Sequence, residues 1–102
     1  MVKDILQTKM LEFAKAKDTL RLGVIRYFLS QIKNKEIELR PQGIEITDAH
    51  IFKVLKKQIK QINETIETCE KANRAEALQK AKDEKVVLEE FVTLFPTEIQ
   101  QL

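Results

Sequence analysis

The chain has 102 residues, of which 43% are hydrophobic and 33% are charged, a balance typical of one small folded domain and not of a disordered protein. Eighteen basic and 16 acidic residues leave a net charge of +2, so the total charge alone does not indicate binding to nucleic acid. Two glycines and two prolines provide few turns, which favours long helices. No apolar run approaches the ~20 residues that span a bilayer and no secretory segment opens the chain, so we expect a cytoplasmic protein without membrane contact.

The first predicted helix spans residues 2–16 and the second spans residues 18–39. Asp18 is expected to cap the second helix, because a carboxylate accepts hydrogen bonds from the free N–H groups of a first turn. Two apolar stripes run along the second helix, which indicates that it packs against more than one neighbour. The positions expected to be buried in these helices are Ile5, Leu6, Met10, Phe13, Leu20, Leu22, Val24, Ile25, Phe28, Leu29, Ile32 and Leu39.

The loop "RPQGIEIT" leads to a third predicted helix over residues 47–71, capped by Thr47. The fourth predicted helix spans residues 73–94, and Asn73 and Glu76 have the spacing of a capping box at its start. Apolar residues at 3-4 spacing form a seam on the third helix, which suits antiparallel pairing with another helix. The two seams consist of Phe52, Leu55, Ile59, Ile62, Ile66 and Cys69, and of Leu78, Ala81, Leu88 and Val92.

These segments predict an all-α fold, either a four-helix bundle or a pair of helical hairpins, with residues 1–95 as the domain. Phe95 and Pro96 are expected to end the fourth helix. The last residues, "PTEIQQL", then begin like another helix, because Thr97 and Gln100 again have capping-box spacing.

Residue types that support metal binding or nucleophilic catalysis are scarce. Cys69 is the only cysteine and His50 the only histidine, so the chain can form neither an internal disulfide nor a cysteine-based or two-histidine zinc site. No phosphate-cradling glycine loop, Ser/His/Asp set or paired-carboxylate motif occurs. We therefore expect no metal, no cofactor and no catalytic residue, with His50 at the surface and Cys69 packed in the core.

Basic residues provide the one candidate binding surface. Lys53, Lys56, Lys57 and Lys60 recur along one face of the third helix, and such a stripe can follow nucleic-acid phosphates. The alternative is an ordinary solvated face, partly neutralised by Glu64 and Glu67, since no aromatic residue interleaves the lysines. A second group on the preceding helix contains Arg26 and Lys33. The residues assigned to nucleic-acid contact are Arg21, Arg26, Lys33, Lys56, Lys57 and Lys60.

Glu36 interrupts an apolar stripe of the second helix. A buried carboxylate needs a partner, because desolvation of an isolated charge is costly. Arg40 lies one turn further along the helix, and an arginine from another helix would serve equally. We predict a structural ion pair between Glu36 and Arg40 rather than a catalytic carboxylate.

Several phrases of the sequence, spread over nearly the whole chain, together resemble the YqeY family. They are "KAKDTLRLGVIRYFLSQIKNKEIEL", "VLKKQIKQINETIE", "EKANR" and "VLEEF", in the order and at the spacing of that family. Family members usually have glycine where Asn73 stands, and both residues suit a position between helices. After "LEEF" this chain continues with "VTLFP", whereas the family generally reaches its proline sooner.

The resemblance implies a helical N-terminal domain followed by a small tail domain, of which residues 96–102 would be the start of a truncated or missing copy. The tail is similar to the C-terminal tail of the GatB subunit of the tRNA-dependent amidotransferase. That GatB tail contacts tRNA. The resemblance therefore implies tRNA, or a tRNA-amidotransferase-type complex, as a partner. The carbon–nitrogen ligase label that the family carries, with glutamine as amido donor, has no supporting residue in this sequence.

Two functions remain open at this point. The first is a non-catalytic domain that assists tRNA-linked metabolism by binding. The alternative is a protein-interaction or oligomerisation module with no nucleic-acid role, because seams of 3-4 spacing pair between chains as readily as within one.

Overall fold

The computed structural model describes all 102 residues as helices and loops, with no strand. Its four long helices are α1 (Val2–Lys15), α2 (Thr19–Leu39), α3 (Asp48–Lys71) and α4 (Ala75–Val92). A short 3-10 helix, η1 (Arg40–Gln42), follows α2, and a single turn, α5 (Thr97–Gln100), follows α4. The all-α prediction is confirmed, and the predicted ends of the four helices agree with the structure to within about two residues. None of these helices combines the length and apolar character that crossing a membrane requires.

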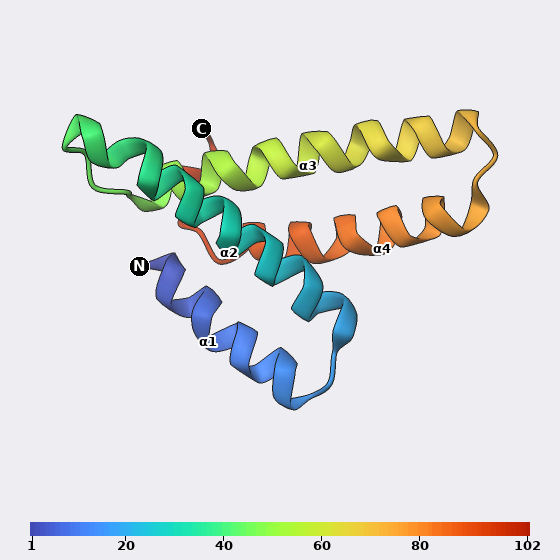
Figure 1. Ribbon diagram of the computed structural model, residues 1–102, viewed down its shortest axis with the longest axis horizontal. Helices are drawn as coiled ribbons and strands as arrows, with labels where there is room; N and C mark the ends of the chain where they lie inside the picture. The colour runs from blue at the N-terminus through green and yellow to red at the C-terminus, as the bar shows by residue number, and fades with distance from the viewer.

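The four long helices form two antiparallel hairpins, which is one of the two architectures predicted. α3 and α4 lie side by side along the longest dimension of the molecule, and α1 and α2 form a more open pair (Figure 1). α2 lies across the α3–α4 hairpin and contacts both of its helices as well as α1. The two apolar stripes of α2 are explained by this central position.

The core lies where α2 crosses the hairpin. Phe28 of α2 stacks on Phe91 of α4, with ring centroids 5.8 Å apart. Ile5, which was expected to be buried, is instead 44% exposed, because α1 packs through the neighbouring Leu6 and a step of one residue turns a side chain by about 100° around the helix. The other large side chains that are fully buried are Leu6, Ile25, Ile32, Ile51, Leu55 and Val87.

The turn between α3 and α4 differs from the prediction. Asn73 has a left-handed conformation with φ of 54°, and the amide of Arg74 donates to the carbonyl of Cys69 at 3.0 Å. This Schellman arrangement satisfies carbonyls at the C-terminus of α3, and asparagine tolerates its left-handed backbone better than most residues. The predicted capping box of Asn73 and Glu76 is therefore wrong, because Asn73 closes α3 and Arg74 is the N-cap of α4.

The turn between α1 and α2 has the same geometry. Lys17 has a φ of 58°, and the amide of Asp18 donates to the carbonyl of Phe13 at 3.0 Å. The carboxylate of Asp18 then accepts a hydrogen bond from the amide of Arg21 at 3.1 Å, so the predicted N-cap of the second helix is confirmed.

Thr47 caps α3, as predicted, and His50 completes the cap. The amide of His50 donates to Thr47 Oγ1 at 3.4 Å, and His50 Nδ1 accepts from the amide of Thr47 at 3.0 Å. The imidazole thus takes the place that Glu or Gln has in the usual capping box. The only histidine of the chain therefore contributes to the start of a helix.

The C-terminal turn does not have the predicted capping box. Pro96 is the N-cap of α5, and the side-chain amide of Gln100 donates to the carbonyl of Phe95 at 2.8 Å instead of pairing with Thr97. Phe95 itself is buried, and its ring packs edge-on against Phe52 with centroids 5.1 Å apart. This contact attaches the segment after α4 to the first half of α3.

Candidate nucleic-acid interface

Four lysines along one side of α3, hereafter the lysine row, are all exposed: Lys53, Lys56, Lys57 and Lys60. None of them takes part in an ion pair, since the five ion pairs of the structure involve other residues. Glu64 and Glu67 line the same shallow depression as Lys56 and Lys60 without pairing with them. Lys56 donates to the main-chain carbonyl of Leu102, whereas the other three lysines have no hydrogen-bond partner in the protein. Most of the row is therefore available to an anionic ligand.

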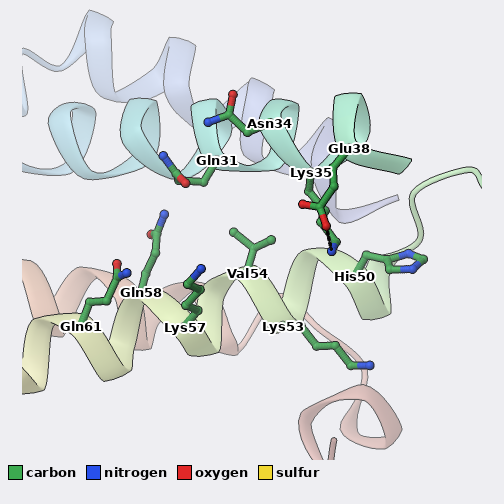
Figure 2. A pocket seen from close by; sticks show the side chains of 10 residues that line it. All are labelled: Gln31, Asn34, Lys35, Glu38, His50, Lys53, Val54, Lys57, Gln58 and Gln61. Atoms are coloured by element: carbon green, nitrogen blue, oxygen red, sulfur yellow. Dashed lines mark hydrogen bonds and ion pairs between the residues drawn. The ribbon is translucent and has the colours of Figure 1, made fainter. Parts of the chain in front are cut away.

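A groove of about 430 Å³ lies between α2 and α3 beside the lysine row (Figure 2). Gln31 of α2 and Gln58 of α3 point toward each other across this α2–α3 groove, and Lys57 also points toward α2, whereas Lys53 points away from it. Val54 is the one apolar side chain among the residues that line the groove. The polar ones are Gln31, Asn34, Lys35, Glu38, His50, Lys53, Lys57, Gln58 and Gln61.

Gln58 is the one buried polar residue of the molecule, with 6% of its surface exposed. Its side-chain nitrogen Nε2 has no hydrogen-bond partner. A buried donor left without a partner costs about 1–3 kcal/mol, so native structures contain few of them. An unpartnered amide nitrogen in the wall of a groove is a position at which a ligand can supply the missing acceptor.

A second, smaller cavity of about 160 Å³ adjoins the groove where α2, α3 and α4 meet. Tyr27 of α2 lines this Tyr27 crevice and is 56% exposed. Gln58 and Gln61 line both cavities, so the crevice and the groove share a wall. Glu84 of α4 is the one carboxylate that lines the crevice.

Tyr27 was not predicted as a site residue. We expected no aromatic residue to interleave the basic groups, although Tyr27 directly follows Arg26 in the second of them. The structure brings the aromatic ring from a different helix, because α2 crosses α3 beside Gln58 and Gln61. The signal that the sequence offered was a tyrosine next to Arg26 and outside the two apolar stripes of its helix.

The predicted contact residues on α2 lie outside the α2–α3 groove. Arg26 and Lys33 are exposed, and they lie seven residues apart on one face, but neither lines the α2–α3 groove. The basic residue of α2 that lines the groove is Lys35, which pairs with Glu38 at 3.2 Å.

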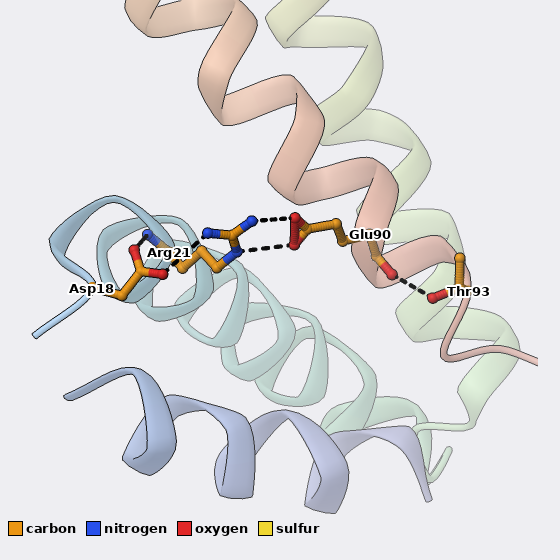
Figure 3. A network of polar contacts seen from close by, with 4 residues as sticks. All are labelled: Asp18, Arg21, Glu90 and Thr93. Atoms are coloured by element: carbon orange, nitrogen blue, oxygen red, sulfur yellow. Dashed lines mark hydrogen bonds and ion pairs between the residues drawn. The ribbon is translucent and has the colours of Figure 1, made fainter. Parts of the chain in front are cut away.

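Arg21, also expected to contact nucleic acid, is occupied within the protein. Its Nε donates to Glu90 Oε2 at 3.0 Å, its Nη2 donates to Glu90 Oε1, and its Nη1 donates to Asp18 at 3.1 Å. Figure 3 shows the guanidinium between the two carboxylates, with Thr93 bonded to the main-chain carbonyl of Glu90. Arg21 therefore joins α2 to α4 and is not part of the exposed basic surface.

The contacts of Arg21 change the protonation behaviour of this network. Hydrogen bonds from the Arg21 side chain lower the pKa of Glu90 below its ordinary value of 4.5. The backbone amide of Arg21, and after it the side chain, lower the pKa of Asp18. The pKa of Arg21 is raised in return, chiefly by its hydrogen bonds to Glu90. All three groups are thus held in their charged forms.

Glu36 forms an ion pair, but with a different partner from the one predicted. Its Oε1 lies 2.5 Å from Nζ of Lys3, a residue of α1, whereas Arg40 is exposed in η1 and forms no ion pair. Arg40 still lies one helical turn from Glu36, since its amide donates to the carbonyl of Glu36. The predicted pair is absent because the packing of α1 against α2 places Lys3 beside the carboxylate instead.

The remaining titratable candidates occupy structural positions. His50 is engaged in the cap of α3, and Cys69 is buried with 7% of its surface exposed. No group of three or more His, Cys, Asp or Glu side chains gathers at one place.

Comparison with known proteins identifies the family of the chain. The YqeY family model, described as "Yqey-like protein", matches residues 3–101. A search of curated proteins found no match. The family match covers nearly the whole chain and agrees with the phrases of sequence that resemble this family. The chain therefore belongs to the YqeY family.

Proposed function

We propose that this domain binds RNA, and tRNA in particular, through the lysine row and the α2–α3 groove, without catalysing a reaction on it. The observation that carries the proposal is the exposed row of lysines, none of them in an ion pair, beside a groove lined almost entirely by polar side chains. Lysine ammonium groups attract phosphates. Carboxamides donate hydrogen bonds to base edges and ribose hydroxyls and also accept hydrogen bonds from them.

The distribution of charge supports this proposal, although the net charge is only +2. The lysine row spans residues 53–60 of α3, whereas Glu64, Glu67 and Glu70 follow it along the helix. The helix therefore has a basic part beside the groove and an acidic part away from it. A local basic surface of this kind can attract a polyanion to one end of a nearly neutral protein.

The choice of tRNA among RNAs rests on the family resemblance alone, which implies a tail domain similar to the GatB tail. The choice of contact residues rests on exposure. Lys53, Lys56, Lys57 and Lys60 would follow the phosphates at the groove, and Arg26 and Lys33 would contact a neighbouring part of a large RNA. Arg21 is left out because its guanidinium is already bound.

Salt titration of a labelled tRNA transcript tests the proposal. The logarithm of the association constant should fall linearly with the logarithm of the salt concentration, because each phosphate contact releases counterions. The double variant Lys57→Gln/Lys60→Gln should bind more weakly and reduce the slope by about 2, since each lysine that pairs with a phosphate contributes about 1 to it. The matched control is Lys80→Gln/Lys82→Gln, which removes the same charge from exposed positions on α4. Absence of binding at low salt, or equal weakening in both variants, would show that this surface is not the RNA site.

A second candidate function, self-association, is favoured by exposed apolar side chains. Leu11 of α1 is 60% exposed and Val86 of α4 is 57% exposed. Sedimentation equilibrium tests it directly, and a monomer across the accessible concentration range would remove this candidate.

A further inference from the structure

We infer that the Tyr27 crevice and the adjoining α2–α3 groove bind an unstacked nucleobase of single-stranded RNA, with the ring of Tyr27 as the stacking surface. The inference rests on the proposed function and adds the structural class of the RNA that is recognised. Unpaired nucleotides fit this site because their bases are free to leave the stack, whereas the bases of a duplex are not.

Tyr27 is the only exposed aromatic ring of the molecule. It is 56% exposed, whereas the five phenylalanines are buried or half-buried. The Tyr27 hydroxyl forms no hydrogen bond within the protein that would explain its position. Stacking of bases on aromatic side chains is the usual way in which proteins hold single-stranded nucleic acid, and a tyrosine beside a basic groove is suited to it.

The polar groups beside Tyr27 match the edge of a base. Gln58 presents a buried nitrogen donor without a partner at the wall shared by the two cavities, and base edges carry ring-nitrogen and carbonyl acceptors. Gln61 lies on the same wall and can both donate and accept. Glu84 can accept from an exocyclic amine, such as the N4 amine of cytosine.

The lysine row places positive charge where the phosphates of such a nucleotide would lie. Lys57 precedes Gln58 in the chain and lies one helical turn before Gln61, so its ammonium group is a neighbour of the carboxamides. Figure 2 shows Lys57 and Gln58 pointing toward α2 from adjacent positions of α3. A base held at Gln58 and Gln61 would therefore keep its phosphate close to Lys57.

The fluorescence of tyrosine gives a direct test, because Tyr27 is the only tyrosine and the chain has no tryptophan. The probe is an oligocytidylate of about eight residues, comparable to a single-strand site. Tyrosine emission should fall as the oligocytidylate binds. A parallel titration of free N-acetyltyrosinamide corrects for the light that the oligomer itself absorbs. An oligomer of equal length built from abasic residues should bind through its phosphates without quenching Tyr27.

Two variants locate the base with a second readout, the anisotropy of the labelled oligocytidylate. Tyr27→Ala should weaken binding by about fivefold or more, whereas Tyr27→Phe, which keeps the ring, should bind like the wild type. Gln58→Met keeps the length of the side chain and removes the donor, so it should weaken binding of oligocytidylate and leave binding of the abasic oligomer unchanged. Circular dichroism shows that each variant is folded before it is compared.

The outcomes separate this inference from the proposed function. Binding of oligocytidylate without a change in tyrosine emission, with Tyr27→Ala equal to the wild type, would overturn the nucleobase site and leave the basic RNA surface intact. A duplex of the same length that quenches Tyr27 equally would also overturn it. Absence of binding by any of these oligomers and by tRNA would overturn the proposed function, and the nucleobase site with it.

Discussion

Arg21 of α2 and Glu90 of α4 form a two-bond ion pair between residues 69 positions apart in the sequence, with Nε 3.0 Å from Oε2. Asp18 binds the same guanidinium from the start of α2. Phe28 and Phe91 join the same two helices in the core. The Arg21–Glu90 pair therefore adds a polar link between α4 and the first turn of the central helix.

The Arg21–Glu90 pair should make stability depend on pH in the acid range. The folded state lowers the pKa of Glu90 below its ordinary value of 4.5, so the stabilisation is complete above that value and is lost as the pH falls through the folded-state pKa. Glu90→Gln should lower the free energy of unfolding by about 1 kcal/mol at neutral pH, since both partners are partly exposed, and by less in acid. Urea unfolding at neutral and acid pH measures both values.

The control for the Glu90→Gln variant is Glu89→Gln, an exposed neighbour without an ion pair. A decrease of equal size at both pH values would contradict the assignment.

Removal of the α3 cap should destabilise the domain. Thr47→Ala takes away the side-chain acceptor for the amide of His50 and should cost about 1 kcal/mol in thermal or urea unfolding. Thr68→Ala is the matched control in the same helix, where the hydroxyl only bonds the preceding turn, and it should be close to neutral. Equal effects of the two substitutions would mean that the cap contributes nothing specific.

Lys17→Gly should stabilise the domain by up to about 1 kcal/mol. Lys17 has a φ of 58°, a conformation that costs a residue with a Cβ about 1–2 kcal/mol and costs glycine almost nothing. Glycine also has more conformational freedom in the unfolded chain, which offsets part of this gain. Thermal unfolding measures the change. The same substitution two residues earlier, Lys15→Gly, lies within α1 and should destabilise it instead. A destabilising Lys17→Gly would show that the lysine side chain itself is needed at the turn.

Gln58→Met should maintain or increase stability while it weakens RNA binding. The substitution replaces a buried donor without a partner by an apolar side chain of similar length, which removes a desolvation cost of about 1 kcal/mol or more. Urea unfolding and oligocytidylate binding, measured on the same preparation, should therefore change in opposite directions. Gln61→Met, at an exposed position three residues further on, should change stability little. A strongly destabilised Gln58→Met would mean that the carboxamide has a structural partner in solution.

The sequence by itself determined the features that depend on residues within one or two turns of each other. The spacing of Leu55, Ile62 and similar positions predicts the helices, because a helical face repeats every three or four residues whatever it packs against. The caps at Asp18 and Thr47 are equally local, since each side chain bonds an amide three residues away. The lysine stripe of α3 follows from the same periodicity.

Only the tertiary structure decided which groups meet across helices. The angle at which α2 crosses the α3–α4 hairpin brings Tyr27 beside Gln58 and brings Arg21 to Glu90, and the packing of α1 brings Lys3 to Glu36. A single sequence does not encode these distances locally, because crossing angles arise from the packing of side chains over whole helix faces. The periodicity of one helix can therefore reveal a basic stripe, whereas the site that we propose beside it requires residues from three.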